Sequence, residues 1–235
     1  MWAELFYYLT KTKGLTSIRS GHRSEMASYM ARYRREKKNW DLHFKECHFW
    51  IKQFIAENPK RRERLLIFGA GEMFDIPSEI LPQFKEVVAF DIVETARVRE
   101  IKKIYPHVRF QEADLSSYLK KWEFHFSTET DLVLSMNVLS QLPLIPLNLL
   151  HKKKYSDSKL EVMGQKIISE HLNLLNKHNG LLIADVVWNI EGEVYDPYFK
   201  VSLGPSLSEW SWQLDSKRSN IVGVWKTKNF FPPEK

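Results

Sequence analysis

Five short, mostly apolar runs constrain this chain more than any other feature of its sequence. They cover residues 65–68, 87–90, 108–110, 131–136 and 181–187. Runs this short, bounded by glycine or polar residues, are typical of strands buried on both faces of a sheet. Amphipathic helical patterns at 94–105 and 158–178 lie between them. Strands that alternate with helices predict an α/β fold with a parallel sheet and right-handed crossovers.

The end of the chain breaks this alternation. Residues 210–214 alternate apolar and polar side chains, residues 215–220 have the composition of a turn, and residues 221–225 are again mainly apolar. Two strands joined by a short polar loop pair antiparallel. The sequence therefore predicts a C-terminal antiparallel hairpin beside the parallel strands.

The N-terminal quarter is helical in pattern and basic. Residues 22–57 predict one or two helices, and Asn58-Pro59 ends them. Residues 1–64 hold 15 Lys and Arg against 7 Asp and Glu, a net charge of +8, whereas the whole chain has +6. The excess favours a solvated helix face, with an anionic partner as the alternative. We expect an N-terminal helical cap over residues 1–60 and an α/β domain over residues 61–235.

Composition excludes several classes of protein. Hydrophobic residues make up 43% and charged residues 27%, an ordinary globular balance. Cys47 is the only cysteine, which excludes an intramolecular disulfide framework and a multi-cysteine metal centre, and we expect a reducing, cytoplasmic setting. His43, Cys47 and His48 do not converge on a helix, so no metal is predicted. No apolar run reaches the ~20 residues that cross a bilayer, so no membrane association is expected.

Residues that could carry chemistry stand where the predicted strands end. In strand order they are Gly69 and Gly71, Asp91, Asp114, Asn137 and Asp185. Ligands of open parallel sheets bind at this edge. Glycine lets a ligand approach bare backbone, and an acidic residue 20 positions after Gly71 suits the hydroxyls of a ribose. The pattern predicts a site for a nucleoside-containing cofactor.

Two common nucleotide motifs do not fit. A dinucleotide fingerprint would place its third glycine at Phe74, and Pro77 delays the helix whose N-terminus would bind a pyrophosphate. These features disfavour a nicotinamide or flavin dinucleotide. The phosphate-binding loop of nucleoside triphosphatases is absent from the sequence.

Five segments in order give the chain a family resemblance. They are LLIFGAGEMFDIP (65–77), VVAFDIV (87–93), RFQEADLS (109–116), TDLVLSMNVLSQLP (130–143) and NGLLIADVVW (179–188). They resemble the class I S-adenosylmethionine-dependent methyltransferases, over about half the chain. The GAG-x3-D-I-P loop, the N-V-L-S-Q-L-P stretch and the helical N-terminus are similar to a poorly characterised bacterial group within that family.

The resemblance implies a Rossmann-like, mostly parallel seven-stranded sheet closed by the C-terminal hairpin. It also implies that S-adenosylmethionine is the cofactor, that the glycine loop faces its methionine part and ribose, that Asp91 binds the ribose hydroxyls and that Asp114 faces the adenine. The predicted cofactor-binding residues are Phe68, Gly69, Ala70, Gly71, Asp75, Asp91, Ile92, Asp114, Leu115 and Asn137. Asn137 is the candidate catalytic residue at the methyl group, with Asp75, Gln141 and Asp185 as further polar groups near the acceptor.

The sequence does not identify the methyl acceptor. A small molecule is favoured, with nucleic acid or protein as alternatives. Asn137 is not followed by the Pro-Pro-aromatic motif of amino-methylating DNA enzymes, and Cys47 precedes the α/β region, unlike the nucleophile of cytosine-C5 enzymes. The family's usual third loop glycine falls at Met73. Two other functions stay open: a non-catalytic nucleoside- or nucleic-acid-binding module, and a NAD-linked oxidoreductase.

Overall fold

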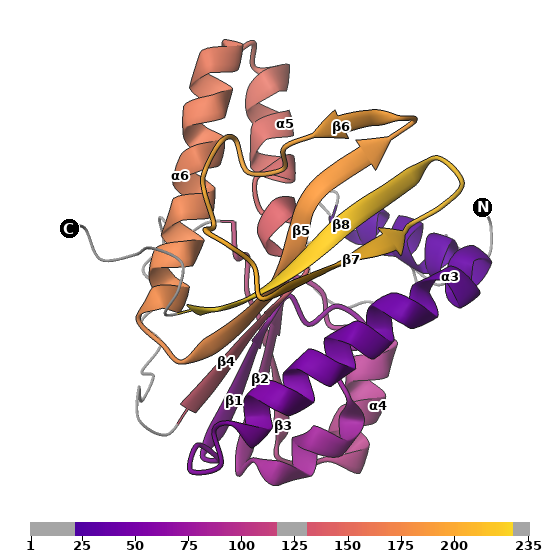
Figure 1. The fold of residues 1–235 in the computed structure, drawn as a ribbon, viewed down its shortest axis with the longest axis vertical. Coiled ribbons are helices and arrows are strands. Elements are labelled where there is room, and N and C mark those ends of the chain that lie inside the picture. The colour runs from indigo at the N-terminus through magenta and orange to yellow at the C-terminus, as the bar shows by residue number, and fades with distance from the viewer. Residues whose placement is uncertain (1–21, 117–130, 228–235) are drawn as a thin grey trace.

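The computed structural model describes residues 22–116 and 131–227; the predictions for residues 1–21 lie outside this range. The described residues form one sheet and the helices around it (Figure 1). The strands are β1 (Arg64–Phe68), β2 (Glu86–Asp91), β3 (Val108–Glu112), β4 (Asp131–Met136), β5 (Gly180–Ile190), β6 (Glu193–Tyr195), β7 (Ser208–Gln213) and β8 (Arg218–Lys226). The α-helices are α3 (His22–Ala56), α4 (Ala96–Ile104), α5 (Leu144–Lys152) and α6 (Asp157–Asn176), with 3-10 turns η1 (Ser78–Gln83) and η2 (Leu139–Gln141).

The sheet has the expected parallel core and reversed end. Its order is β3-β2-β1-β4-β5-β8-β7, and β6 pairs with β5 outside this path. The pairs among β1 to β5 are parallel, whereas β8 runs antiparallel between β5 and β7. The predicted α/β fold with a seven-stranded path and a C-terminal hairpin is confirmed. The sequence did not predict β6, which pairs with the last residues of β5.

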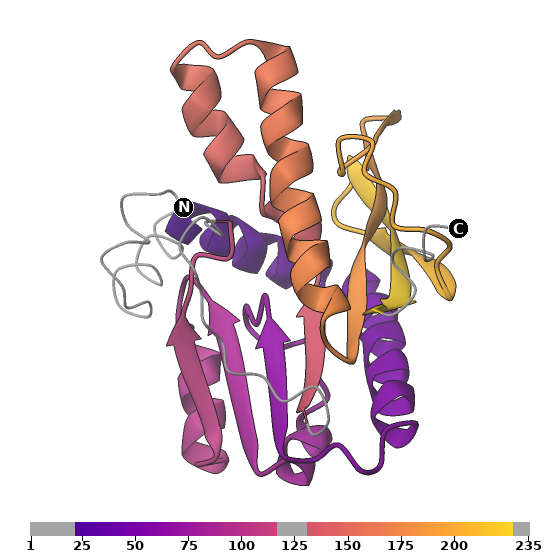
Figure 2. The same ribbon diagram turned by 90° about the vertical axis from the view of Figure 1, so that its left-hand side faces the viewer.

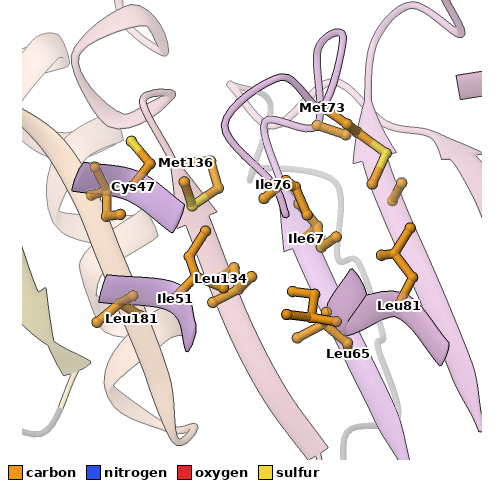
Figure 3. Close-up of a cluster of buried hydrophobic side chains, with 14 of the residues drawn as sticks. Cys47, Ile51, Leu65, Ile67, Met73, Ile76, Leu81, Leu134, Met136 and Leu181 are labelled. Atoms are coloured by element: carbon orange, nitrogen blue, oxygen red, sulfur yellow. The ribbon is translucent and has the colours of Figure 1, made fainter. Parts of the chain in front are cut away.

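Both faces of the sheet are buried, which explains why its strands read as continuous apolar runs. On one face, Leu65 and Ile67 belong to the same cluster as Cys47 and Ile51 of α3. In Figure 3, the two helix residues lie beside Leu134 of β4, and Leu65 and Ile67 lie on the side of Leu81. On the other face, Leu66 and Phe68 belong to a second cluster. That cluster includes Ile167, Ile168, Leu172 and Leu175 of α6. Because successive side chains point to opposite faces, one short strand stabilises both layers.

The two parts of the long N-terminal helix α3 lie in different environments. Residues 22–56 form one helix rather than two, and its axis changes direction along the way. Its first part lies over the carboxyl edge of the sheet, and its later part runs along one face (Figures 1 and 2). The later part is anchored by Trp40, Phe54 and their neighbours in the core. The helix therefore connects the core to the edge where the predicted site lies.

The basic side chains of this helix lie mostly on its solvent-exposed side. Arg34, Arg35, Lys37 and Lys38 are exposed, as a solvated face predicts. Cys47 is fully buried, and its sulfur lies 3.6 Å from His43 Nε2, so these two residues form a packed helix face. Within the described ranges, every helix is too short or too polar to span a bilayer.

Candidate functional site

A cavity of about 450 Å³ lies at the carboxyl edge of the sheet, where the predicted residues meet. Its lining includes Gly69, Ala70, Gly71, Asp75, Asp91, Ile92, Asp114, Leu115, Asn137, Gln141 and Asp185. Phe68 is the exception, since its buried side chain stacks on Phe90 in the core and does not line the cavity. A volume of this size suits one small-molecule site.

The glycine turn after β1 adopts a conformation that few other residues take. Gly69 has φ +74°, and a Cβ there would lie 2.6 Å from Val138 Cβ and 2.7 Å from the Met136 carbonyl oxygen. Gly71 has φ +48°, but a Cβ there would meet no atom within 4 Å. Gly69 is therefore required for packing, whereas Gly71 presents bare backbone to open space. Met73, at the position of the family's third glycine, also has a positive φ of 55°.

Asp91 connects the glycine turn to the end of β2. Its Oδ2 accepts a hydrogen bond from Gly71 N at 2.8 Å, and its Oδ1 accepts one from Ile92 N at 2.7 Å. Thr95, not Asp91, caps α4 by accepting from Val98 N. Asp91 therefore does not act as the cap of this helix. Two backbone N–H groups hold this carboxylate at the cavity wall.

Asp114 closes the same side of the cavity. Its Oδ1 accepts from Ser116 N at 3.0 Å and from Ser116 Oγ at 2.6 Å, so the chain turns around this carboxylate. The alternative role as a cap for a helix over residues 115–121 depends on residues outside the described ranges. Asp91 and Asp114 follow neighbouring strands, because β2 pairs with β3.

A buried polar chain lies behind the middle of the cavity. Asn137 Nδ2 donates to Asp75 Oδ2 at 3.0 Å and lies 3.2 Å from His43 Nε2. Trp210 Nε1 donates to His43 Nδ1 at 3.1 Å, and the His43 ring stacks on Trp212 at 3.8 Å. Burial raises the pKa of Asp75 to about 6, although the hydrogen bond from Asn137 opposes the shift. Burial lowers the pKa of His43 to about 3, so this ring is neutral at pH 7.

Asn137 has an unusual geometry for its place. Its φ of +48° lies in the left-handed region, which asparagine tolerates better than most residues. Its Oδ1 is buried without a hydrogen-bond partner in the described part of the chain, although the residue lines the cavity. A buried acceptor that lacks a partner costs free energy, so a hydrogen-bond donor on a ligand would stabilise it.

Sequence reasoning missed several residues of the site. Tyr29 and Arg32 of α3 line the cavity, as do Trp188 and Asn220 of β5 and β8. Trp212 of β7 also lines it. The helix and the hairpin reach the site through tertiary packing, which no local motif encodes. One sequence feature could have indicated that this helix approaches the site: His43 is a polar residue on an otherwise apolar helix face. Among the described residues, no group of three or more His, Cys, Asp or Glu side chains could hold a metal ion.

The strand order and the reversed hairpin form a Rossmann-like, mostly parallel seven-stranded path, as the family resemblance implied. No protein-family model and no curated protein matches the sequence. Solved structures similar to the chain include WbdD, at 12% identity and a TM-score of 0.48 over 80% of this chain. The match covers only 40% of the WbdD chain.

Two further similar structures were solved with S-adenosylhomocysteine bound. One is the 1,6-didemethyltoxoflavin-N1-methyltransferase of Burkholderia thailandensis, at 13% identity and a TM-score of 0.45, covering 86% of each chain. The other is the N-methyltransferase NodS of Bradyrhizobium japonicum, at 14% identity and a TM-score of 0.43, covering 81% of this chain and 87% of NodS.

Proposed function

We propose that this protein is an S-adenosylmethionine-dependent methyltransferase that acts on a small acceptor. The observation that carries the proposal is the Asp91 carboxylate, which Gly71 N and Ile92 N fix at the wall of the cavity beside a bare glycine turn. A fixed carboxylate next to accessible backbone suits a ribose joined to an amino-acid chain.

The residues present fit such a cofactor in order along the sheet edge. Neighbouring strands lie roughly 4.8 Å apart, so side chains at successive strand ends form a row. Asp114 would face the adenine, Asp91 the ribose hydroxyls and the Gly69–Gly71 turn the methionine part. Leu115 and Ile92 supply apolar surface beside the adenine position. Asn137 then follows at the end of β4, and Asp185 lies within β5 at its register shift, where the acceptor would approach.

The charge of the cavity also suits this cofactor. Asp75, Asp91 and Asp114 all line it, and the cofactor carries a sulfonium and an ammonium group. Asn137 Oδ1, buried and without a partner among the described residues, could accept a hydrogen bond from that ammonium. A carboxylate beside a cation is stabilised in its ionised form, so a bound cofactor would lower the pKa of Asp75 from about 6.

When bound, S-adenosylmethionine supplies a methyl group that the sulfonium has already activated. The protein then has to orient a nucleophile in line with this group at close distance, and a general base is optional. Asn137 is fixed for this purpose by its backbone N–H, which donates to the Ile183 carbonyl at 2.7 Å, and by its bond to Asp75. Its position at the cavity after β4 supports the proposal that Asn137 faces the transferred group.

Titration calorimetry with S-adenosylhomocysteine tests the proposal. We expect one binding site on protein that has been freed of copurified ligand, and much weaker binding of NAD. Lack of binding by protein whose circular dichroism shows a folded state would overturn the assignment. Binding of NAD in preference to S-adenosylhomocysteine would favour an oxidoreductase instead.

A further inference from the structure

A second polar cluster stands at the opposite end of the cavity from Asp114. Its centre is Asp185, which is 4% exposed. Ser140 Oγ and Trp188 Nε1 donate to Asp185 Oδ2 at 2.6 and 2.8 Å, and Asn220 Nδ2 donates to Oδ1 at 2.8 Å. The Tyr198 hydroxyl donates to the Asp185 backbone carbonyl. Three side chains thus fix the carboxylate, and a fourth holds the backbone of the same residue.

The backbone places this carboxylate at the cavity. The pairing of β5 with β8 shifts register between Asp185 and Val187, as a β-bulge does. Bulges redirect a side chain and occur often beside binding sites. An ordinary buried strand residue here would be apolar, because burying a carboxylate is costly unless its oxygens are hydrogen-bonded.

The hydrogen bonds leave room for one more donor. A carboxylate has about four acceptor positions. Among residues 22–116 and 131–227, two donors, Ser140 and Trp188, occupy Oδ2, whereas Asn220 alone occupies Oδ1. Asp185, Trp188 and Asn220 all line the cavity. The remaining acceptor position on Oδ1 can therefore serve a ligand.

The walls on this side are mainly apolar and aromatic, although Arg218 and Asn148 also line them. The apolar part is formed by Trp188, Ile190, Trp212, Leu214, Leu144 and Ile145. The last two belong to α5, a helix of mainly apolar sequence in which no residue is buried. Leu144 is 46% exposed and Ile190 is 37% exposed. Apolar side chains left accessible at the rim of a cavity indicate a surface that a ligand covers.

We propose that this end of the cavity binds the methyl acceptor as a compact aromatic compound whose O–H or N–H group donates to Asp185 Oδ1. The proposal deepens the methyltransferase function and rests on it. The aromatic ring of the ligand lies between Trp188 and Trp212 on one side and α5 on the other. Its O–H or N–H group points toward Asp185 Oδ1. A cavity of about 450 Å³ that also holds a cofactor leaves space for a small acceptor only.

Matched small probes test the donor requirement. We would titrate para-ethylphenol, para-ethylaniline and para-ethylanisole into the protein saturated with S-adenosylhomocysteine. The titrations would be at pH 8, because burial raises the pKa of Asp185 and the carboxylate must be ionised. The phenol or the aniline should bind at least about tenfold more tightly than the anisole, which lacks a donor. If the phenol binds more tightly than the aniline, the methyl acceptor is expected to carry an O–H group. If the aniline binds more tightly, an N–H group is expected.

Asp185→Asn supplies the second arm of the experiment. It should reduce the preference for the donor probe over the anisole to about threefold or less, and leave the affinity for S-adenosylhomocysteine unchanged. Glu193→Gln is the matched control, because Glu193 is an exposed carboxylate on β6 outside the cavity. This variant should keep the full preference.

The failures of the two proposals are distinguishable. Equal or undetectable binding of all three probes by the wild-type complex would overturn the acceptor proposal, while S-adenosylhomocysteine binding would leave the methyltransferase function standing. A preference that survives Asp185→Asn would also overturn it. If the variant does not fold, the three-probe comparison on the wild type decides alone. If S-adenosylhomocysteine does not bind, the methyltransferase function fails first.

Discussion

The two ends of the cavity hold a carboxylate by different means. Asp91 is held by backbone N–H groups of Gly71 and Ile92, one of them its direct neighbour in sequence. Asp185 is held by the side chains of Ser140, Trp188 and Asn220, which come from three separate segments. The first arrangement follows from backbone conformation, whereas the second depends on which side chains meet. The proposed cofactor end is therefore fixed by the fold, and the proposed acceptor end can change without altering the fold.

The largest effect should come from the glycine turn. Gly69→Ala should lower the free energy of unfolding by roughly 3 to 4 kcal/mol, since the new methyl group meets Val138 and the Met136 carbonyl oxygen in addition to the cost of a positive φ. Gly71→Ala is the matched variant and should cost about 1 kcal/mol, because only the φ is unfavourable there. Urea denaturation measures both. Equal losses would show that the turn is not packed as described.

Asp91→Ala should weaken binding of S-adenosylhomocysteine by about 100-fold, because the ribose hydroxyls and Gly71 N both lose a charged acceptor. Glu86→Ala is the control, since Glu86 stands at the far end of the same strand, paired with Arg109. Calorimetry should find wild-type affinity for this control. If Asp91→Ala bound S-adenosylhomocysteine with wild-type affinity, the proposed contact between Asp91 and the ribose would be refuted. The contrast between the proposed cofactor end and the proposed acceptor end would then be lost.

Trp210→Phe examines the support that α3 and the hairpin give each other. The indole N–H that satisfies His43 Nδ1 is lost and only a smaller phenyl ring remains, so a buried acceptor becomes unsatisfied and some buried packing is lost. The expected loss is about 2 kcal/mol in the free energy of unfolding, measured by thermal and urea denaturation. Cofactor affinity should change by less than about threefold, because neither Trp210 nor His43 lines the cavity. A large loss of cofactor affinity would mean that the two ends are coupled.

The smallest effect concerns pH. The pKa of Asp75 is raised to about 6 in the folded protein, above the ordinary value of 3.8. Its contribution to stability therefore falls as the pH rises from about 4 to 6. Relative to the wild type, Asp75→Asn should gain about 1 kcal/mol between pH 5 and pH 7. His43 and His171, whose pKa values burial lowers to about 3, favour stability at higher pH in both proteins. An identical pH dependence in both proteins would contradict the shift.

The same contrast explains what the sequence could predict. The strands, the hairpin and the row of residues at the sheet edge follow from local patterns, and Asp91 could be placed because its partners lie in the adjoining turn. The position of Asp185 at the cavity also followed from its strand. Its partners did not, because Ser140 and Asn220 lie 45 residues before and 35 residues after it. A bulge and a hydrogen-bond cluster of this kind depend on tertiary packing.

Two further results could not be read from periodicity. The pattern of residues 22–57 allowed one helix or two, since the side that faces the core changes where the axis turns. Phe68 seemed to border the site because it precedes Gly69, but strand alternation directs its side chain into the core. Adjacency in sequence is a weak guide to exposure at the end of a buried strand.

The placement of indole rings gives this molecule an optical asymmetry. Trp188 and Trp212 border the cavity on the side of Asp185, whereas Asp91, Asp114 and the glycine turn have no tryptophan beside them among the residues that line it. Emission from these rings should therefore respond to an aromatic compound at one end and stay nearly constant when the other end fills. The protein would thus report by its own fluorescence which half of the crevice is occupied.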